Sequence, residues 1–92
     1  MARLDQGEIE RRVGRLADWA LEGEAIQRGI GCGNFLGSVK LVNRIAPIAE
    51  AMGHHPDLAI SWDTVTVTIT THSEGGLTAA DFELAGRIDA LA

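Results

Sequence analysis

The 92-residue sequence predicts an α+β domain in which a four-stranded antiparallel sheet has helices packed on one face. Segment 64–71 alternates Thr with Val or Ile, the period-two pattern of a strand with one buried face. Segment 35–52 repeats apolar residues at helical spacing. Shorter strand-like segments occur in two pairs, one on each side of that helix. Two hairpins separated by a helix favour this sheet, with the element order α-β-β-α-β-β-α.

The first part of the chain is expected to form a helix and a hairpin. Asp5 and Glu8 have capping-box spacing and precede an apolar series at positions i, i+4 and i+7. This pattern predicts a helix over about 6–18. The hairpin is predicted to have strands at 19–21 and 25–30, joined by a tight turn.

A long helix is expected to follow, with Asn34 as its N-cap. Its predicted buried face comprises Phe35, Val39, Val42, Ile45, Ala49 and Met52. Pro47 lies inside this pattern and should bend the helix, because proline removes a backbone donor and crowds the preceding turn. Gly53 is expected to end the helix, and Pro56 to prevent it from restarting.

The second hairpin is predicted to have strands at 58–62 and 64–71. The second of these strands is uncharged and would promote aggregation at an open edge. It should therefore lie centrally in the sheet or be covered by a second subunit. Thr78 is expected to cap a final helix. The inner face of that helix would comprise Leu84, Ala85, Ile88 and Leu91.

Length and composition favour one domain over residues 1–92. A net charge of −5 argues against a nucleic-acid binder that works through phosphate contacts. No apolar run approaches the roughly 18 residues of a membrane span, and the first residues lack the apolar stretch of a signal peptide. The single Cys32 excludes an internal disulfide. Together these features favour a cytoplasmic protein.

The residues suited to proton transfer gather in the second half of the chain. Glu50 falls in the last turn of the long helix, and His54 and His55 follow in a chain reversal. His72 ends the long strand, and Asp81 falls in the first turn of the last helix. Histidine is the side chain best suited to give and take protons near neutral pH. We therefore expect an acid–base site in which Asp81 could orient an imidazole.

Each of these residues also has a simpler explanation. Asp81 stands three residues after Thr78, so a capping box explains it without any site. Glu50 could be a solvated helix residue, and the two tryptophans could be core residues. A zinc site made by the three histidines is chemically sufficient, but adjacent histidines rarely bind one ion. A serine hydrolase is set aside because no G-x-S-x-G motif is present.

The spacing of these residues resembles that of the pterin-4a-carbinolamine dehydratase family. The matching pattern is Glu50, three residues, His54-His55-Pro56, an aromatic at Trp62, nine residues, His72 and then Asp81. The run Thr-His-Ser-Glu-Gly-Gly-Leu-Thr at 71–78 resembles the family's loop before its last helix. Trp19 and the hairpin after it are similar to the family's first hairpin. Leu58 departs from the family, which often has an aromatic there.

The resemblance implies dehydration of 4a-hydroxytetrahydropterins to quinonoid dihydropterins in tetrahydropterin recycling, without metal or organic cofactor. It implies that His54, His55 and His72 form the acid–base set, that Asp81 and Glu50 orient them, and that Trp62, Trp19 and Pro56 contact substrate. It also implies a homodimer or homotetramer. The alternative is a non-catalytic dimerisation module, or a pterin-binding protein, on the same scaffold.

Overall fold

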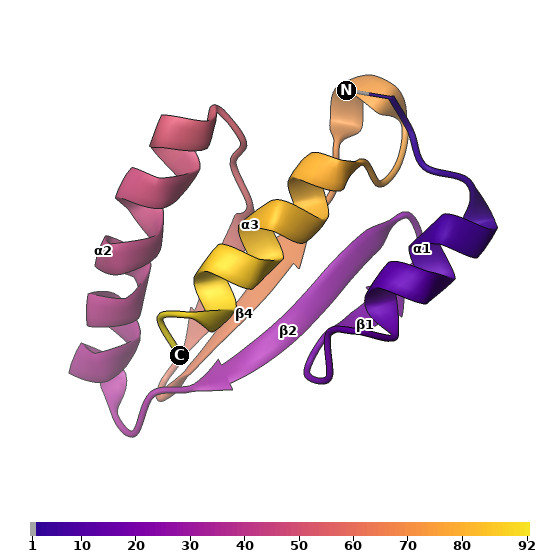
Figure 1. Ribbon diagram of the computed structural model, residues 1–92. Helices are drawn as coiled ribbons and strands as arrows, with labels where there is room; N and C mark the ends of the chain where they lie inside the picture. The colour runs from indigo at the N-terminus through magenta and orange to yellow at the C-terminus, as the bar shows by residue number, and fades with distance from the viewer. Residues whose placement is uncertain (1) are drawn as a thin grey trace.

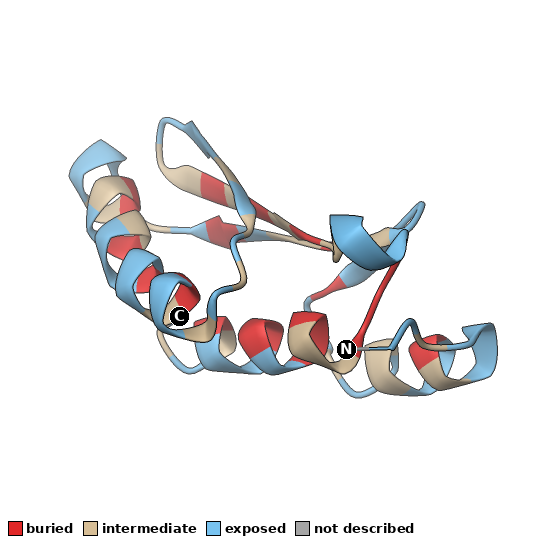
Figure 2. Ribbon diagram, turned by 90° about the horizontal axis from the view of Figure 1, so that it is seen from above, coloured by how far each residue is buried: buried red, intermediate tan, exposed pale blue. Residues whose placement is uncertain are grey.

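The computed structural model describes residues 2–92 and confirms the expected order of helices and strands. The elements are α1 (Gln6–Val13), β1 (Ala20–Glu22), β2 (Ala25–Gly31), α2 (Phe35–Met52), β3 (Asp57–Ser61), β4 (Thr64–Ile69), the short 3₁₀ helix η1 (His72–Glu74) and α3 (Ala79–Asp89). Helices α2 and α3 lie over the same face of the sheet (Figure 1), and the view from above places α1 on that side as well (Figure 2).

The sheet is antiparallel throughout, with the strand order β1-β2-β4-β3. The uncharged strand β4 is central, as expected, because it pairs with β2 on one side and with β3 on the other. Its burial alternates: Val65, Val67 and Ile69 are fully buried, whereas the threonines between them are half-buried. Strand β3 is left as one open edge of the sheet.

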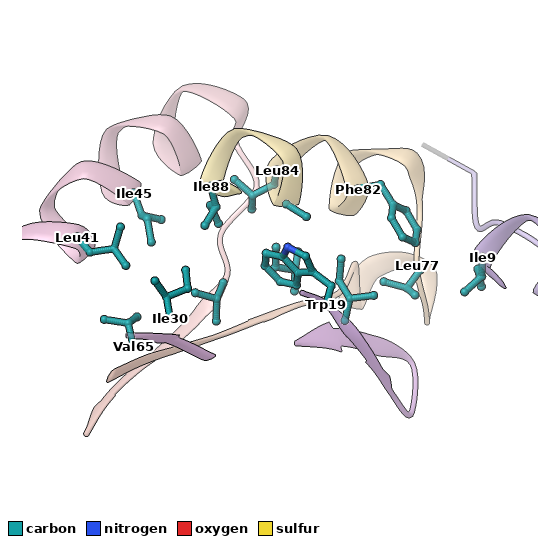
Figure 3. Close-up of a cluster of buried hydrophobic side chains, with 14 residues drawn as sticks. Ile9, Trp19, Ile30, Leu41, Ile45, Val65, Leu77, Phe82, Leu84 and Ile88 are labelled. Atoms are coloured by element: carbon teal, nitrogen blue, oxygen red, sulfur yellow. The ribbon is translucent and has the colours of Figure 1, made fainter. Parts of the chain in front are cut away.

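The hydrophobic core lies between the sheet and the helices. Ile45 of α2 and Leu84 and Ile88 of α3 are completely buried above the apolar side chains of β2 and β4 (Figure 3). The buried faces of the helices accordingly turn toward the strands in Figure 2. Two candidate site residues lie at helix ends: His54 follows the end of α2, and Asp81 is in the first turn of α3.

Two helix predictions were partly wrong. Helix α1 ends at Val13 rather than near residue 18, because Gly14 is a poor helix former and becomes the C-cap. The buried face of α2 consists of Ser38, Leu41, Ile45 and Ala49, while Phe35 is 55% exposed. A serine occupies this face because its hydroxyl donates to the Trp62 carbonyl at 2.9 Å.

The N-cap of α1 agrees with the sequence, but the capping box that its spacing suggested does not form. Asp5 accepts a hydrogen bond from the backbone of Glu8, although the Glu8 side chain pairs with Arg12 and Arg11 instead of completing a capping box. The hydrogen bond from Arg12, followed by the effect of Arg11, holds the pKa of Glu8 below its usual value.

Helix α2 continues through Pro47, whose ring is exposed. Among residues 2–92, no helix is both long and apolar enough to cross a membrane.

Gly53 ends α2 in the left-handed conformation, with φ of 62°. Replacing it with Ala should destabilise the protein by about 1–2 kcal/mol, because an L-residue is strained there. Gly86 is the matched control: it lies inside α3, and an added Cβ would likewise meet nothing within 4 Å. Gly86→Ala should stabilise the protein by about 0.5–1 kcal/mol. Urea denaturation measures both changes, and equal effects of the same sign would contradict this reasoning.

Candidate active site

His54 is held by a buried carboxylate from another part of the chain. After Gly53 reverses the backbone, the His54 amide donates to the carbonyl of Ala49 at 3.1 Å. The His54 ring then places Nε2 2.5 Å from Oδ1 of Asp81. The His54 side chain is 14% exposed and that of Asp81 is 0% exposed. Solvent therefore reaches the imidazole, whereas the carboxylate that orients it is fully enclosed.

Asp81 also forms the capping box of α3. Its Oδ2 accepts the backbone N–H of Thr78 at 2.8 Å, and Thr78 accepts a backbone hydrogen bond in return. The Thr71 hydroxyl donates to the same Oδ2 at 2.8 Å. The helix cap and the orienting role, which the sequence presented as competing explanations, therefore exist together. One carboxylate oxygen serves the cap and the other serves His54.

This pairing determines which ring nitrogen of His54 carries the proton. An ionised carboxylate only accepts hydrogen bonds, so Nε2 of His54 is the donor to Asp81. In the neutral ring, Nδ1 then has a free lone pair. A histidine arranged in this way can accept a proton at Nδ1 while the carboxylate keeps the ring in place.

The other two histidines occupy more open positions. His72 is exposed and begins η1 directly after Thr71, whose hydroxyl is bonded to Asp81. His55 is also exposed, and its Nε2 lies 2.8 Å from Oε1 of the exposed Glu50. Asp81 thus contacts His54 directly, and it contacts the segment that carries His72 through the Thr71 hydroxyl. Glu50, which the resemblance implies as an orienting residue, contacts only His55 among the three histidines, and it does so at the surface.

The two tryptophans lie away from His54 in the same chain. Trp62 is at the β3–β4 turn, whereas His54 lies near the opposite end of this hairpin, separated by roughly 16 Å of strand. Trp19 is buried and donates from Nε1 to Asp89 at 2.8 Å, so it is part of the core. Neither tryptophan lines the histidine site within one subunit. Pro56 is half-buried and follows His55 directly at the entrance to β3.

Thr71 was not among the predicted site residues, and Thr78 was predicted only as a helix cap. Their hydroxyl oxygens are 3.0 Å apart. The available signals were the position of Thr71 beside His72 and its place in the 71–78 run, because a threonine at the end of a Thr-rich strand is otherwise unremarkable.

Two hollows on the described surface lie apart from the histidines. Hollows of about 470 and 370 Å³ lie between α1 and α3 and between α2 and the end of β2, and no histidine lines either. Within residues 2–92, no three histidine, cysteine or acidic side chains converge as they would around a metal ion. The His54–Asp81 pair is therefore the arrangement best suited to chemistry.

Comparison with known proteins supports the resemblance found in the sequence. The family model described as pterin 4 alpha carbinolamine dehydratase matches residues 2–91. A protein from Sulfolobus acidocaldarius, provisionally named pterin-4-alpha-carbinolamine dehydratase, is 44% identical over 87 residues, covering 95% of this chain and 96% of its own. A protein from a Cyanothece species with the same provisional name is 46% identical over 88 residues, covering 96% of this chain and 91% of its own.

A solved structure shares the whole fold. The crystal structure described as a transcriptional coactivator/pterin dehydratase from Brucella melitensis superposes with a TM-score of 0.92 at 33% identity. The match covers 98% of each chain. The chain therefore belongs to the pterin-4a-carbinolamine dehydratase family, whose members are hydro-lyases.

Proposed function

We propose that this protein dehydrates 4a-hydroxytetrahydropterins to quinonoid dihydropterins by histidine acid–base catalysis, without metal or organic cofactor. The family points to the substrate class. The single observation that carries the mechanism is the 2.5 Å contact between His54 and the buried Asp81. This contact leaves His54 Nδ1 available for proton transfer.

The reaction needs two proton transfers and no change of redox state. The C4a–O bond breaks as a proton is delivered to the departing hydroxyl, a ring nitrogen loses its proton, and a C=N bond forms as water leaves. The free Nδ1 lone pair suits His54 to removing the ring proton. We assign proton delivery to His72, because its segment is tied to Asp81 through Thr71. His55 completes the acid–base set beside Glu50.

A spectrophotometric assay of the purified protein with 4a-hydroxytetrahydropterin tests this proposal. We expect dehydration well above the spontaneous rate, and dialysis against a chelator should not change it. A rate equal to the spontaneous one would refute the dehydratase assignment. A rate lost on chelation and restored by zinc would refute the metal-free mechanism.

We also propose that the protein forms a homodimer or homotetramer through the open edge of β3. This strand has no charged residue from Leu58 to Ser61. Ile60, within the strand, is 39% exposed, and Trp62, directly after it, is 71% exposed. An edge strand whose one charged residue, Asp57, stands at its start, and which carries exposed apolar side chains, readily pairs with another strand.

Paired substitutions on the two sheet edges test this interface. Ile60→Lys should shift the protein toward monomer in sedimentation experiments, because it places a charge on the β3 edge strand itself. Leu21→Lys is the matched control on β1, where the native side chain is 38% exposed. It should leave the assembly intact. A monomeric wild-type protein, or dissociation by Leu21→Lys alone, would contradict the β3 interface.

The alternative of a non-catalytic interaction module uses the same exposed apolar residues. It predicts that binding to a partner survives the loss of His54, and that the purified protein has no dehydratase activity. The assay above therefore distinguishes the two functions.

A further inference from the structure

Thr71 joins the segments that carry His54 and His72. It lies between the end of β4 and the start of η1, and it is half-buried. Its hydroxyl oxygen is 2.8 Å from Oδ2 of Asp81 and 3.0 Å from the hydroxyl oxygen of Thr78. The neighbouring residue in the chain is His72. A single hydroxyl thus connects the β4 end to the first turn of α3.

The direction of these hydrogen bonds follows from counting protons. The Asp81 carboxylate only accepts, so the Thr71 hydroxyl donates its one proton to Oδ2. Between the two threonines, Thr78 must then be the donor and Thr71 the acceptor. The Thr78 oxygen in turn accepts the backbone N–H of Ala80 at 3.3 Å. The result is one directed chain that runs from the α3 backbone to Asp81.

This chain limits rotation of the Asp81 side chain. Oδ2 is held by two donors from different segments, the Thr78 backbone and the Thr71 hydroxyl. The remaining oxygen, Oδ1, is consequently kept facing His54 Nε2. Without the hydroxyl, one of the two restraints on Oδ2 would be lost and the carboxylate could turn. His54 would then lose the partner that keeps its proton on Nε2.

We infer that Thr71 is a positioning residue: its hydroxyl fixes the Asp81 carboxylate so that His54 stays in the Nε2–H tautomer with Nδ1 free. This inference rests on the proposed acid–base function of His54. It assigns Thr71 no contact with substrate. Its effect on the reaction passes through Asp81 and His54.

The test compares Thr71→Val, which removes the hydroxyl at similar size, with Thr71→Ser, which retains it. Nitrogen-15 NMR of histidine-labelled protein reports the tautomer of His54. Wild type and Thr71→Ser should show a single Nε2–H form, whereas Thr71→Val should show a mixture with Nδ1–H. We expect kcat to fall about tenfold in Thr71→Val with less change in KM, and to recover in Thr71→Ser.

The tautomer measurement separates this inference from the proposed function. An Nδ1–H tautomer in the wild type would overturn the inference without any variant. So would a pure Nε2–H form in Thr71→Val. If Thr71→Val does not fold, Thr71→Ala carries the same expectations. A wild-type protein inactive toward pterins would overturn the proposed function, while the tautomer comparison would still decide the role of Thr71.

Discussion

Replacing His54 by Gln is expected to lower kcat for pterin dehydration by about 10²–10⁴-fold. The glutamine amide can still donate to Asp81 Oδ1, which lies 2.5 Å from His54 Nε2 in the wild type. It cannot exchange protons near neutral pH. The buried network around Asp81 should therefore survive, and the free energy of unfolding should change by less than about 1 kcal/mol. Steady-state kinetics and urea denaturation measure the two effects.

Two further variants sharpen this experiment. His54→Ala removes both the proton carrier and the partner of the buried Asp81 oxygen, so it should also destabilise the protein by about 1–3 kcal/mol. Glu83→Gln is a surface control, because Glu83 is an exposed residue of α3 that pairs with Arg87. It should have nearly wild-type kcat and stability. Wild-type turnover by His54→Gln would exclude His54 as a proton carrier.

The central features of the fold were predictable because the local sequence pattern and the packing of the whole domain favour the same structure there. The Thr/Val alternation of 64–71 predicted a strand with one buried face, and β4 is indeed central with its valines buried. Gly53 was expected to end α2, and it does so with positive φ. Thr78 and Asp81 had capping-box spacing, and they form that box. Such features depend on neighbours within a few residues.

The candidate site was predictable only in part. The spacing of His54 and Asp81 identified them as site residues, but their contact joins positions 27 apart in the sequence. It requires the α2–β3 reversal and the start of α3 to meet over the end of β4. No local sequence pattern predicts that these three segments lie together. For the same reason no local pattern predicts that the Thr71 hydroxyl donates a hydrogen bond to the Asp81 carboxylate.

The wrong predictions for the positions of Phe35 and Trp62 have a different cause. Apolar residues at helical spacing predicted Phe35 to be buried, but pattern alone cannot show that a serine with a satisfied hydroxyl takes a place on the buried face. Trp62 was predicted to end the strand at 58–62. It instead lies in the β3–β4 turn with φ of 51°, after β3 has ended at Ser61.

Asp81→Asn is expected to lower kcat by about 10²–10⁴-fold through the tautomer of His54 rather than through the fold. The asparagine oxygen can still accept from the Thr78 backbone and the Thr71 hydroxyl, as Asp81 Oδ2 does at 2.8 Å. Its amide nitrogen then faces His54 and can only donate. His54 must accept at Nε2, so the neutral ring carries its proton on Nδ1. The lone pair proposed to take the substrate proton is lost.

The same variant should stay folded and unfold at a moderately lower denaturant concentration than wild type, because the shape of the side chain and the helix cap are kept. A loss of about 1 kcal/mol is expected from replacing a charged acceptor by a neutral one. Nitrogen-15 NMR of His54 should show the switch from Nε2–H to Nδ1–H, which no general loosening of the fold would produce as a single new tautomer. If Asp81→Asn shows this switch but retains wild-type kcat, then Nδ1 of His54 is not the base. Proton removal must in that case belong to His55 or His72.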